Sequence, residues 1–207
     1  MIRFFGGAGV CLVLTVILAT VFIPVLKSVK MGQKILDIGP RWHKSKEGTP
    51  TMGGLFFLVP ILGIGVVLSF TEKEPLLLVH LAFLLANAAI GFVDDYVKFF
   101  KKQNEGLTPP QKMVLQFAAA TAYVFALKTF GVIDTVLRLP FSENVWELPL
   151  PVYLVLAIIG IVFTVNSVNL TDGIDGLAAS VTAVVMVFMA ALSFKTQNVP
   201  GLAVSLL

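Results

Sequence analysis

Polar side chains recur at every third position of one short segment of this chain: Asn166, Asn169, Asp172 and Asp175. Carboxylate and carboxamide oxygens are hard ligands, and Mg²⁺ typically takes one or two carboxylates together with substrate phosphates. A three-residue step falls about 60° short of a full helical turn, so the four side chains converge only if the segment bends, at Gly173 or Gly176. The spacing therefore predicts a cation and substrate site. The alternative is a polar loop whose Asp172 or Asp175 caps the next helix.

A second acidic cluster is the adjacent pair Asp94 and Asp95, which ends an apolar run. Neighbouring residues on a helix point about 100° apart, so both carboxylates approach one cation only at a helix end or a turn. We predict that Asp94 and Asp95, with Asp172, bind the metal ion, and that Lys98 lies over the face of Asp94. The alternative is a solvated helix end with an ordinary ion pair between positions four apart.

Basic residues follow in two loops. Lys44 and Lys46 are placed to bind an anionic substrate, and the pair Gly53 and Gly54 allows close approach of the backbone to a ligand or helix. The alternative is a basic membrane anchor followed by a helix-packing face. Lys112 is a further candidate for substrate binding.

The elements that must position these residues are membrane helices. The chain has 207 residues, of which 57% are hydrophobic and only 13% are charged, whereas soluble domains carry about 25% charged residues. We therefore predict an all-α, polytopic integral membrane protein that forms a single domain over residues 1–207, with no nucleic-acid partner. Apolar runs of suitable length indicate about six transmembrane helices, at residues 7–26, 52–70, 76–93, 113–130, 150–168 and 174–194.

The charge distribution predicts the orientation of these helices. Most Lys and Arg residues lie at 27–50 and 94–112, two loops that share one side if every helix crosses the membrane, and that side is cytoplasmic by the positive-inside rule. The segment 166–175 falls on the same side. All the unusual polar residues thus face the cytoplasm, which predicts an active-site cleft there. A cation transporter is disfavoured because it would place acidic groups near the bilayer midplane.

Three motifs together resemble a known bacterial family, the phospho-N-acetylmuramoyl-pentapeptide-transferases. They are Gly48-Thr-Pro-Thr-Met-Gly-Gly54, Gly91-Phe-Val-Asp-Asp-Tyr-Val-Lys98 and Val168-Asn-Leu-Thr-Asp-Gly-Ile-Asp-Gly-Leu177. The resemblance implies transfer of phospho-N-acetylmuramoyl-pentapeptide from its UDP carrier to undecaprenyl phosphate in the bacterial inner membrane, with Mg²⁺ and release of UMP. A homodimer is one option for its assembly.

The resemblance also implies roles for individual residues. Asp94 and Asp95 correspond to the acidic pair at the metal and the polyprenyl phosphate, and together with Asp172 and Asp175 they are the expected catalytic residues. The positions expected to bind substrate are Lys44, Lys46, Thr51, Lys98, Lys112, Asn166 and Asn169.

The chain departs from the family pattern in one respect. Family members continue through further spans with a Phe-Met-Gly-Asp motif and a triple-His loop, and neither occurs here. We expect the chain to be the N-terminal part of a longer transferase and to be inactive alone. The remaining alternatives are a related transferase that uses another UDP-N-acetylhexosamine, and a non-catalytic truncated remnant.

Overall fold

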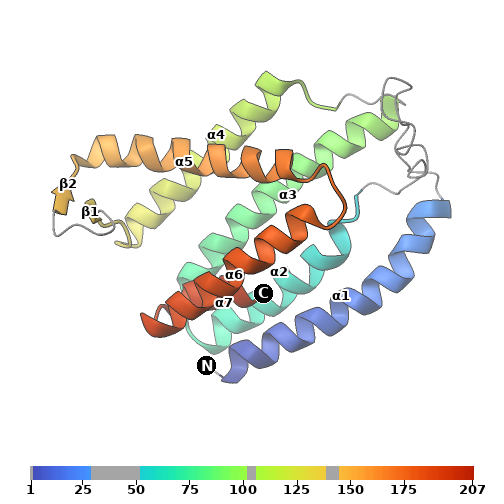
Figure 1. The fold of residues 1–207 in the computed structure, drawn as a ribbon, viewed down its shortest axis with the longest axis horizontal. Coiled ribbons are helices and arrows are strands. Elements are labelled where there is room, and N and C mark those ends of the chain that lie inside the picture. The colour runs from blue at the N-terminus through green and yellow to red at the C-terminus, as the bar shows by residue number, and fades with distance from the viewer. Residues whose placement is uncertain (1, 29–51, 102–105, 139–144) are drawn as a thin grey trace.

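The computed structural model describes residues 2–28, 52–101, 106–138 and 145–207, and it is dominated by helices (Figure 1). Each of the six predicted spans corresponds to a helix, and a short helix follows at the C-terminal end. The helices are α1 (Ile2–Ser28), α2 (Leu55–Thr71), α3 (Pro75–Lys101), α4 (Pro109–Thr129), α5 (Leu150–Thr171), α6 (Leu177–Lys195) and α7 (Val199–Leu206).

Four of the described helices are long and apolar enough to cross a membrane: α1, α3, α5 and α6. Helix α2 is also apolar but has only 17 residues. Helix α4 is less apolar because its first half carries Gln111, Lys112 and Gln116. It lies between α3 and α5 and contacts both, so its buried stripe faces protein. The fold is therefore that of an all-α membrane protein.

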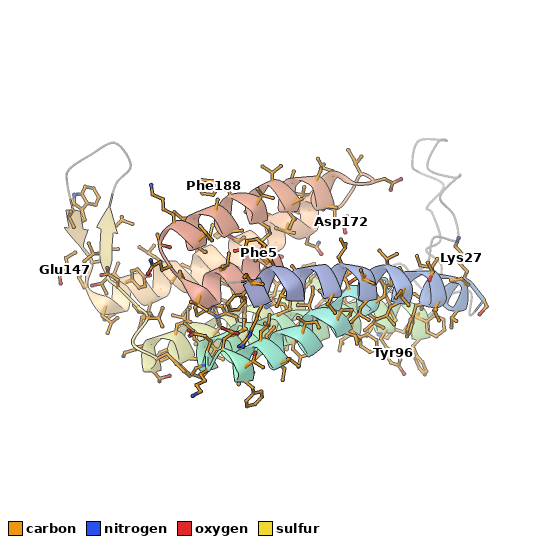
Figure 2. All side chains as sticks on the ribbon, turned by 90° about the horizontal axis from the view of Figure 1, so that it is seen from below. Phe5, Lys27, Tyr96, Glu147, Asp172 and Phe188 are labelled. Carbon is orange, nitrogen blue, oxygen red and sulfur yellow. The ribbon has the colours of Figure 1, made fainter. Side chains whose placement is uncertain are left out.

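The charged residues lie at the two ends of these helices in the arrangement that the sequence predicts. Figure 2 shows Lys27, Tyr96 and Asp172 toward one end of the helices and Glu147 at the opposite end. Helices α1, α3 and α5 end at the first of these two ends, where α4 and α6 begin (Figure 1). The two polar clusters thus lie at the same end of the structure.

Two predicted loops contain regular structure. Helix α3 continues to Lys101, so Asp94 and Asp95 lie inside the helix and not at its end. No helix breaker follows Val93, and Lys98 and Lys101 in the last turn suit the negative end of the helix dipole. Between the predicted spans 113–130 and 150–168, two short strands pair antiparallel, β1 (Val136–Arg138) and β2 (Val145–Glu147).

The main buried cluster joins α1, α2, α3 and α7 near the end opposite the polar clusters. Its fully or nearly buried members are Phe4, Leu68, Leu77, Leu81, Leu202 and Ala203. Gly65 allows α2 and α3 to approach closely, because a Cβ at this position would lie 2.8 Å from the Leu81 side chain. Packing at this end holds α3, which carries the acidic pair at its other end.

Candidate active site

A lysine of the same helix forms ion pairs with both members of the acidic pair on α3. Lys98 Nζ lies 2.6 Å from Asp94 Oδ2 and 3.3 Å from Asp95 Oδ1. The Asp94 side chain is only 13% exposed, whereas those of Asp95 and Lys98 are each 29% exposed. The helical spacing places one ammonium group between two carboxylates. The ion pair of the alternative interpretation is therefore present, and binding of a metal ion by the two carboxylates stays a prediction.

Each aspartate also fixes a different loop. Asp94 Oδ1 accepts a hydrogen bond from the backbone N–H of Leu107 at 2.8 Å. Asp95 Oδ2 accepts one from the backbone N–H of Met52 at 3.3 Å. Gly106 lies directly against Asp94, because an added Cβ would come within 2.6 Å of its backbone oxygen and even closer to its carboxylate. The acidic pair thus joins the end of α3 to the segments that lead into α4 and α2.

Helices α4 and α5 meet through polar side chains at the same end. Lys112 Nζ donates to Asn169 Oδ1 at 3.3 Å, and Asn166 Nδ2 donates to Gln116 Oε1 at 2.8 Å. Lys112 therefore joins α4 to the polar series through Asn169, and Gln116 joins α4 to it through Asn166. The contacts at this end form two groups: Asp94, Asp95 and Lys98 on α3, and the pairs Lys112–Asn169 and Asn166–Gln116 between α4 and α5.

The last two members of the polar series lie in the turn between α5 and α6. Asp172 is the exposed C-cap of α5, and Asp175 is exposed within the turn. Gly176 has a left-handed backbone (φ 79°) and is the N-cap of α6, so the alternative that an aspartate caps this helix is wrong. Glycine takes this position because a positive φ costs it nothing sterically.

A complete carboxylate cage for a metal is not preformed in the described part of the chain, which holds no group of three or more His, Cys, Asp or Glu side chains suitably placed. The pair Asp94 and Asp95 nevertheless fits Mg²⁺, which needs only one or two carboxylates beside substrate phosphates and water. A role for Asp172 as a third ligand stays a prediction.

Three predicted substrate-binding residues, Lys44, Lys46 and Thr51, lie outside the described residues. Sequence reasoning missed Gln116, which is 3% exposed and bonded to Asn166. A signal for it existed, since Gln116 is a polar residue within a predicted span, one helical turn after Lys112. No feature of the sequence indicated that the backbone N–H groups of Met52 and Leu107 donate to Asp95 and Asp94.

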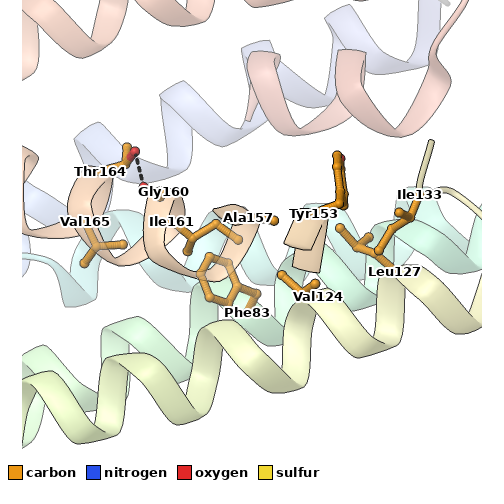
Figure 3. Close-up of a pocket in the computed structure, with 10 residues that line it drawn as sticks. All are labelled: Phe83, Val124, Leu127, Ile133, Tyr153, Ala157, Gly160, Ile161, Thr164 and Val165. Carbon is orange, nitrogen blue, oxygen red and sulfur yellow. Dashed lines mark hydrogen bonds between the residues drawn. The ribbon is translucent and has the colours of Figure 1, made fainter. Parts of the chain in front are cut away.

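A cavity of about 490 Å³ lies between α3, α4 and α5, away from these polar residues (Figure 3). Its lining is apolar, with Phe83, Val124, Leu127 and Ile161 among its residues. Its one threonine, Thr164, donates to the backbone oxygen of Gly160 at 2.8 Å and so stays within its own helix. None of the predicted site residues lines this cavity, so it is distinct from the predicted cytoplasmic cleft.

Comparison with known proteins gives a consistent result. Residues 77–207 match the glycosyl transferase family 4, and residues 46–58 match phospho-N-acetylmuramoyl-pentapeptide-transferase signature 1. The phospho-N-acetylmuramoyl-pentapeptide-transferase of Staphylococcus saprophyticus is 38% identical over 156 residues, which cover 73% of this chain and 48% of the relative. The protein of the same name from Bacillus cytotoxicus is 39% identical over 147 residues, which cover 68% of this chain and 44% of the relative.

The chain thus spans about half the length of the curated relatives that it matches. The match to residues 77–207 includes the acidic pair, Lys112 and the whole polar series of α5. The resemblance seen in the three motifs is confirmed, and the chain belongs to glycosyl transferase family 4.

Proposed function

We propose that the protein containing this chain transfers phospho-N-acetylmuramoyl-pentapeptide from its UDP carrier to undecaprenyl phosphate and releases UMP. The observation that carries the proposal is the acidic pair with its ion-paired Lys98, at the same end of the helices as Lys112 and the polar series. The match of residues 46–58 to the muramoyl-pentapeptide signature favours this substrate over another UDP-N-acetylhexosamine. The proposed location is the bacterial cytoplasmic membrane, with the site on the cytoplasmic side.

The chemistry requires two negatively charged phosphate groups to meet. An oxygen of the lipid phosphate forms a bond to the sugar-bearing phosphorus, and the bond from that phosphorus to the UMP oxygen breaks. Mg²⁺, when bound, supplies positive charge that offsets the repulsion between the two substrates. Asp94 and Asp95 are the residues that would hold it.

The basic residues complete this arrangement. Lys98 pairs with both carboxylates and offsets part of their negative charge. It would become available to a substrate phosphate if the carboxylates held a metal ion instead. Lys112, on the adjacent helix, adds positive charge on the side of the polar series. Lys98, Lys112 and a divalent ion held by the aspartates would together supply the positive charge that the reacting phosphates need.

The test is a transfer assay on the product of the longest reading frame that contains residues 1–207, purified in lipid nanodiscs. We expect UMP release from UDP-N-acetylmuramoyl-pentapeptide with undecaprenyl phosphate and Mg²⁺, its loss with EDTA, and its recovery on adding Mg²⁺. A lipid product from UDP-N-acetylglucosamine instead would support the related transferase. UMP release that persists in EDTA would refute the metal assignment. The 207-residue chain, assayed in parallel, tests whether it is inactive alone.

A further inference from the structure

Gln116 is the one strongly buried polar side chain at the contact between α4 and α5 in the described chain. It is 3% exposed, and its Oε1 lies 2.8 Å from Nδ2 of Asn166. A buried amide is costly to desolvate unless its polar atoms find partners. An apolar residue would therefore suit this part of α4 better if the position served packing alone.

The second bond of Asn166 determines which way its amide points. Nδ2 also donates to the backbone oxygen of Val162, one helical turn earlier, at 2.8 Å. A backbone carbonyl only accepts hydrogen bonds, so the atom that faces it has to be the amide nitrogen. The nitrogen carries two hydrogens, and the second is directed at Gln116 Oε1. Both donors of Asn166 are thus used within the protein.

The carbonyl oxygen of Asn166 is consequently the atom left for a ligand. No described residue donates to this Oδ1, and the residue is half-buried near the Lys112–Asn169 contact. An oriented amide oxygen binds a cation or accepts from an N–H or O–H group, and it repels a phosphate oxygen. The neighbouring Asn169 differs, because its Oδ1 already accepts from Lys112.

We propose that Gln116 is a positioning residue: the Val162 carbonyl sets which way the Asn166 amide points, and Gln116 takes the second N–H and so holds the amide with its Oδ1 toward the substrate site as an acceptor. The orientation of the Asn166 amide is argued from the hydrogen bonds alone. Its expected effect on KM rests on the proposed transferase function. The group that Asn166 recognises is then a hydrogen-bond donor of the nucleotide sugar, or the metal ion.

Three variants separate positioning from packing. Gln116→Met keeps the volume and removes the acceptor, whereas Gln116→Glu keeps an oxygen acceptor for Asn166. Ser69→Ala is the matched control, because Ser69 is also 3% exposed and donates a single hydrogen bond, to the Glu74 backbone oxygen at 2.8 Å, at the opposite end of the structure. Each is made in the product of the longest reading frame and assayed for UMP release with UDP-N-acetylmuramoyl-pentapeptide and Mg²⁺ varied in turn.

We expect Gln116→Met to raise the KM for the nucleotide sugar or for Mg²⁺ about tenfold with little change in kcat, as for loss of one uniform binding contact. Gln116→Glu should recover most of that loss, and Ser69→Ala should lower Tm without changing either KM. A KM for Gln116→Met within about twofold of wild type would overturn the inference. The inference would also be overturned if both variants, Gln116→Met and Gln116→Glu, raised KM equally and in proportion to their fall in Tm.

A direct measurement keeps the inference testable if the wild-type protein transfers nothing, which would refute the proposed function. In the 207-residue chain labelled with ¹⁵N-asparagine, the two side-chain hydrogens of Asn166 should exchange slowly with water. One of them should lose that protection in Gln116→Met and keep it in Gln116→Glu. Rapid exchange of both hydrogens in the wild-type chain would show that the amide is not held.

Discussion

Lys98 Nζ lies 2.6 Å from Asp94 Oδ2, one helical turn away on α3, and also 3.3 Å from Asp95 Oδ1. A single ammonium group therefore occupies the position between two carboxylates where a divalent ion would bind. A bound metal ion would therefore compete with Lys98 for the same carboxylate oxygens. Substitutions in this trio should consequently change metal dependence as well as rate.

The two aspartates should differ in their effect on stability. Asp94→Asn and Asp95→Asn should each reduce UMP release by at least about 10²-fold, the usual scale for removing one electrostatic contact to a reacting group. Asp94→Ala should lower Tm more than Asp95→Ala, because Asp94 is less exposed and holds both Lys98 and the Leu107 N–H at short distances. Thermal unfolding and initial rates check both statements. An Asp94→Asn variant with more than a tenth of the wild-type rate would contradict the role of this carboxylate.

Gly106 should not tolerate a side chain. A Cβ at this position would collide with the carboxylate and backbone oxygen of Asp94, so Gly106→Ala should displace the loop and cost about 1–3 kcal/mol. Gly91→Ala is the stability control, because nothing lies within 4 Å of an added Cβ there, and alanine favours a helix over glycine by about 1 kcal/mol. A Tm for Gly106→Ala equal to or above that of the wild type would show that Gly106 does not lie against Asp94.

Two glycines in α2 provide a similar test of the helix packing that supports the site. Gly65→Ala should lower Tm, by an amount corresponding to about 1–3 kcal/mol, because its Cβ would lie 2.8 Å from two methyl carbons of Leu81 on α3. Gly63→Ala, two residues earlier, meets nothing within 4 Å and should leave Tm unchanged or raise it slightly. Equal effects of the two substitutions would show that α2 and α3 do not approach at Gly65.

The orientation can be measured by labelling single cysteines. Cys11 is the one cysteine of the chain, so a Cys11→Ala background allows Lys101→Cys and Glu147→Cys to be probed separately. Both positions are exposed. In intact cells, a membrane-impermeant maleimide should label Glu147→Cys and should reach Lys101→Cys only after the membrane is permeabilised. The reverse pattern would invert the orientation and place the acidic pair outside the cytoplasm.

The sequence determined where the helices lie and which residues are expected at the site. Apolar runs of membrane length are a local property, and each predicted span corresponds to a helix in the structure. The alternation of basic and acidic loops along the chain was enough to predict that Asp94 and the polar series from Asn166 lie at the same end of the helices. The motifs were enough to indicate the family. No property of distant residues entered these inferences.

The tertiary structure decided which atoms are available for chemistry. The sequence predicted that the acidic pair ends its helix, whereas α3 continues to Lys101 and turns Lys98 back onto both carboxylates. The partners of Asp95 and Asn166 are Met52 and Gln116, at separations of 43 and 50 residues. Such contacts depend on which faces of different helices meet, and the period of one helix does not specify this. Local patterns therefore predict candidate residues of the site, while packing between helices orients their side chains.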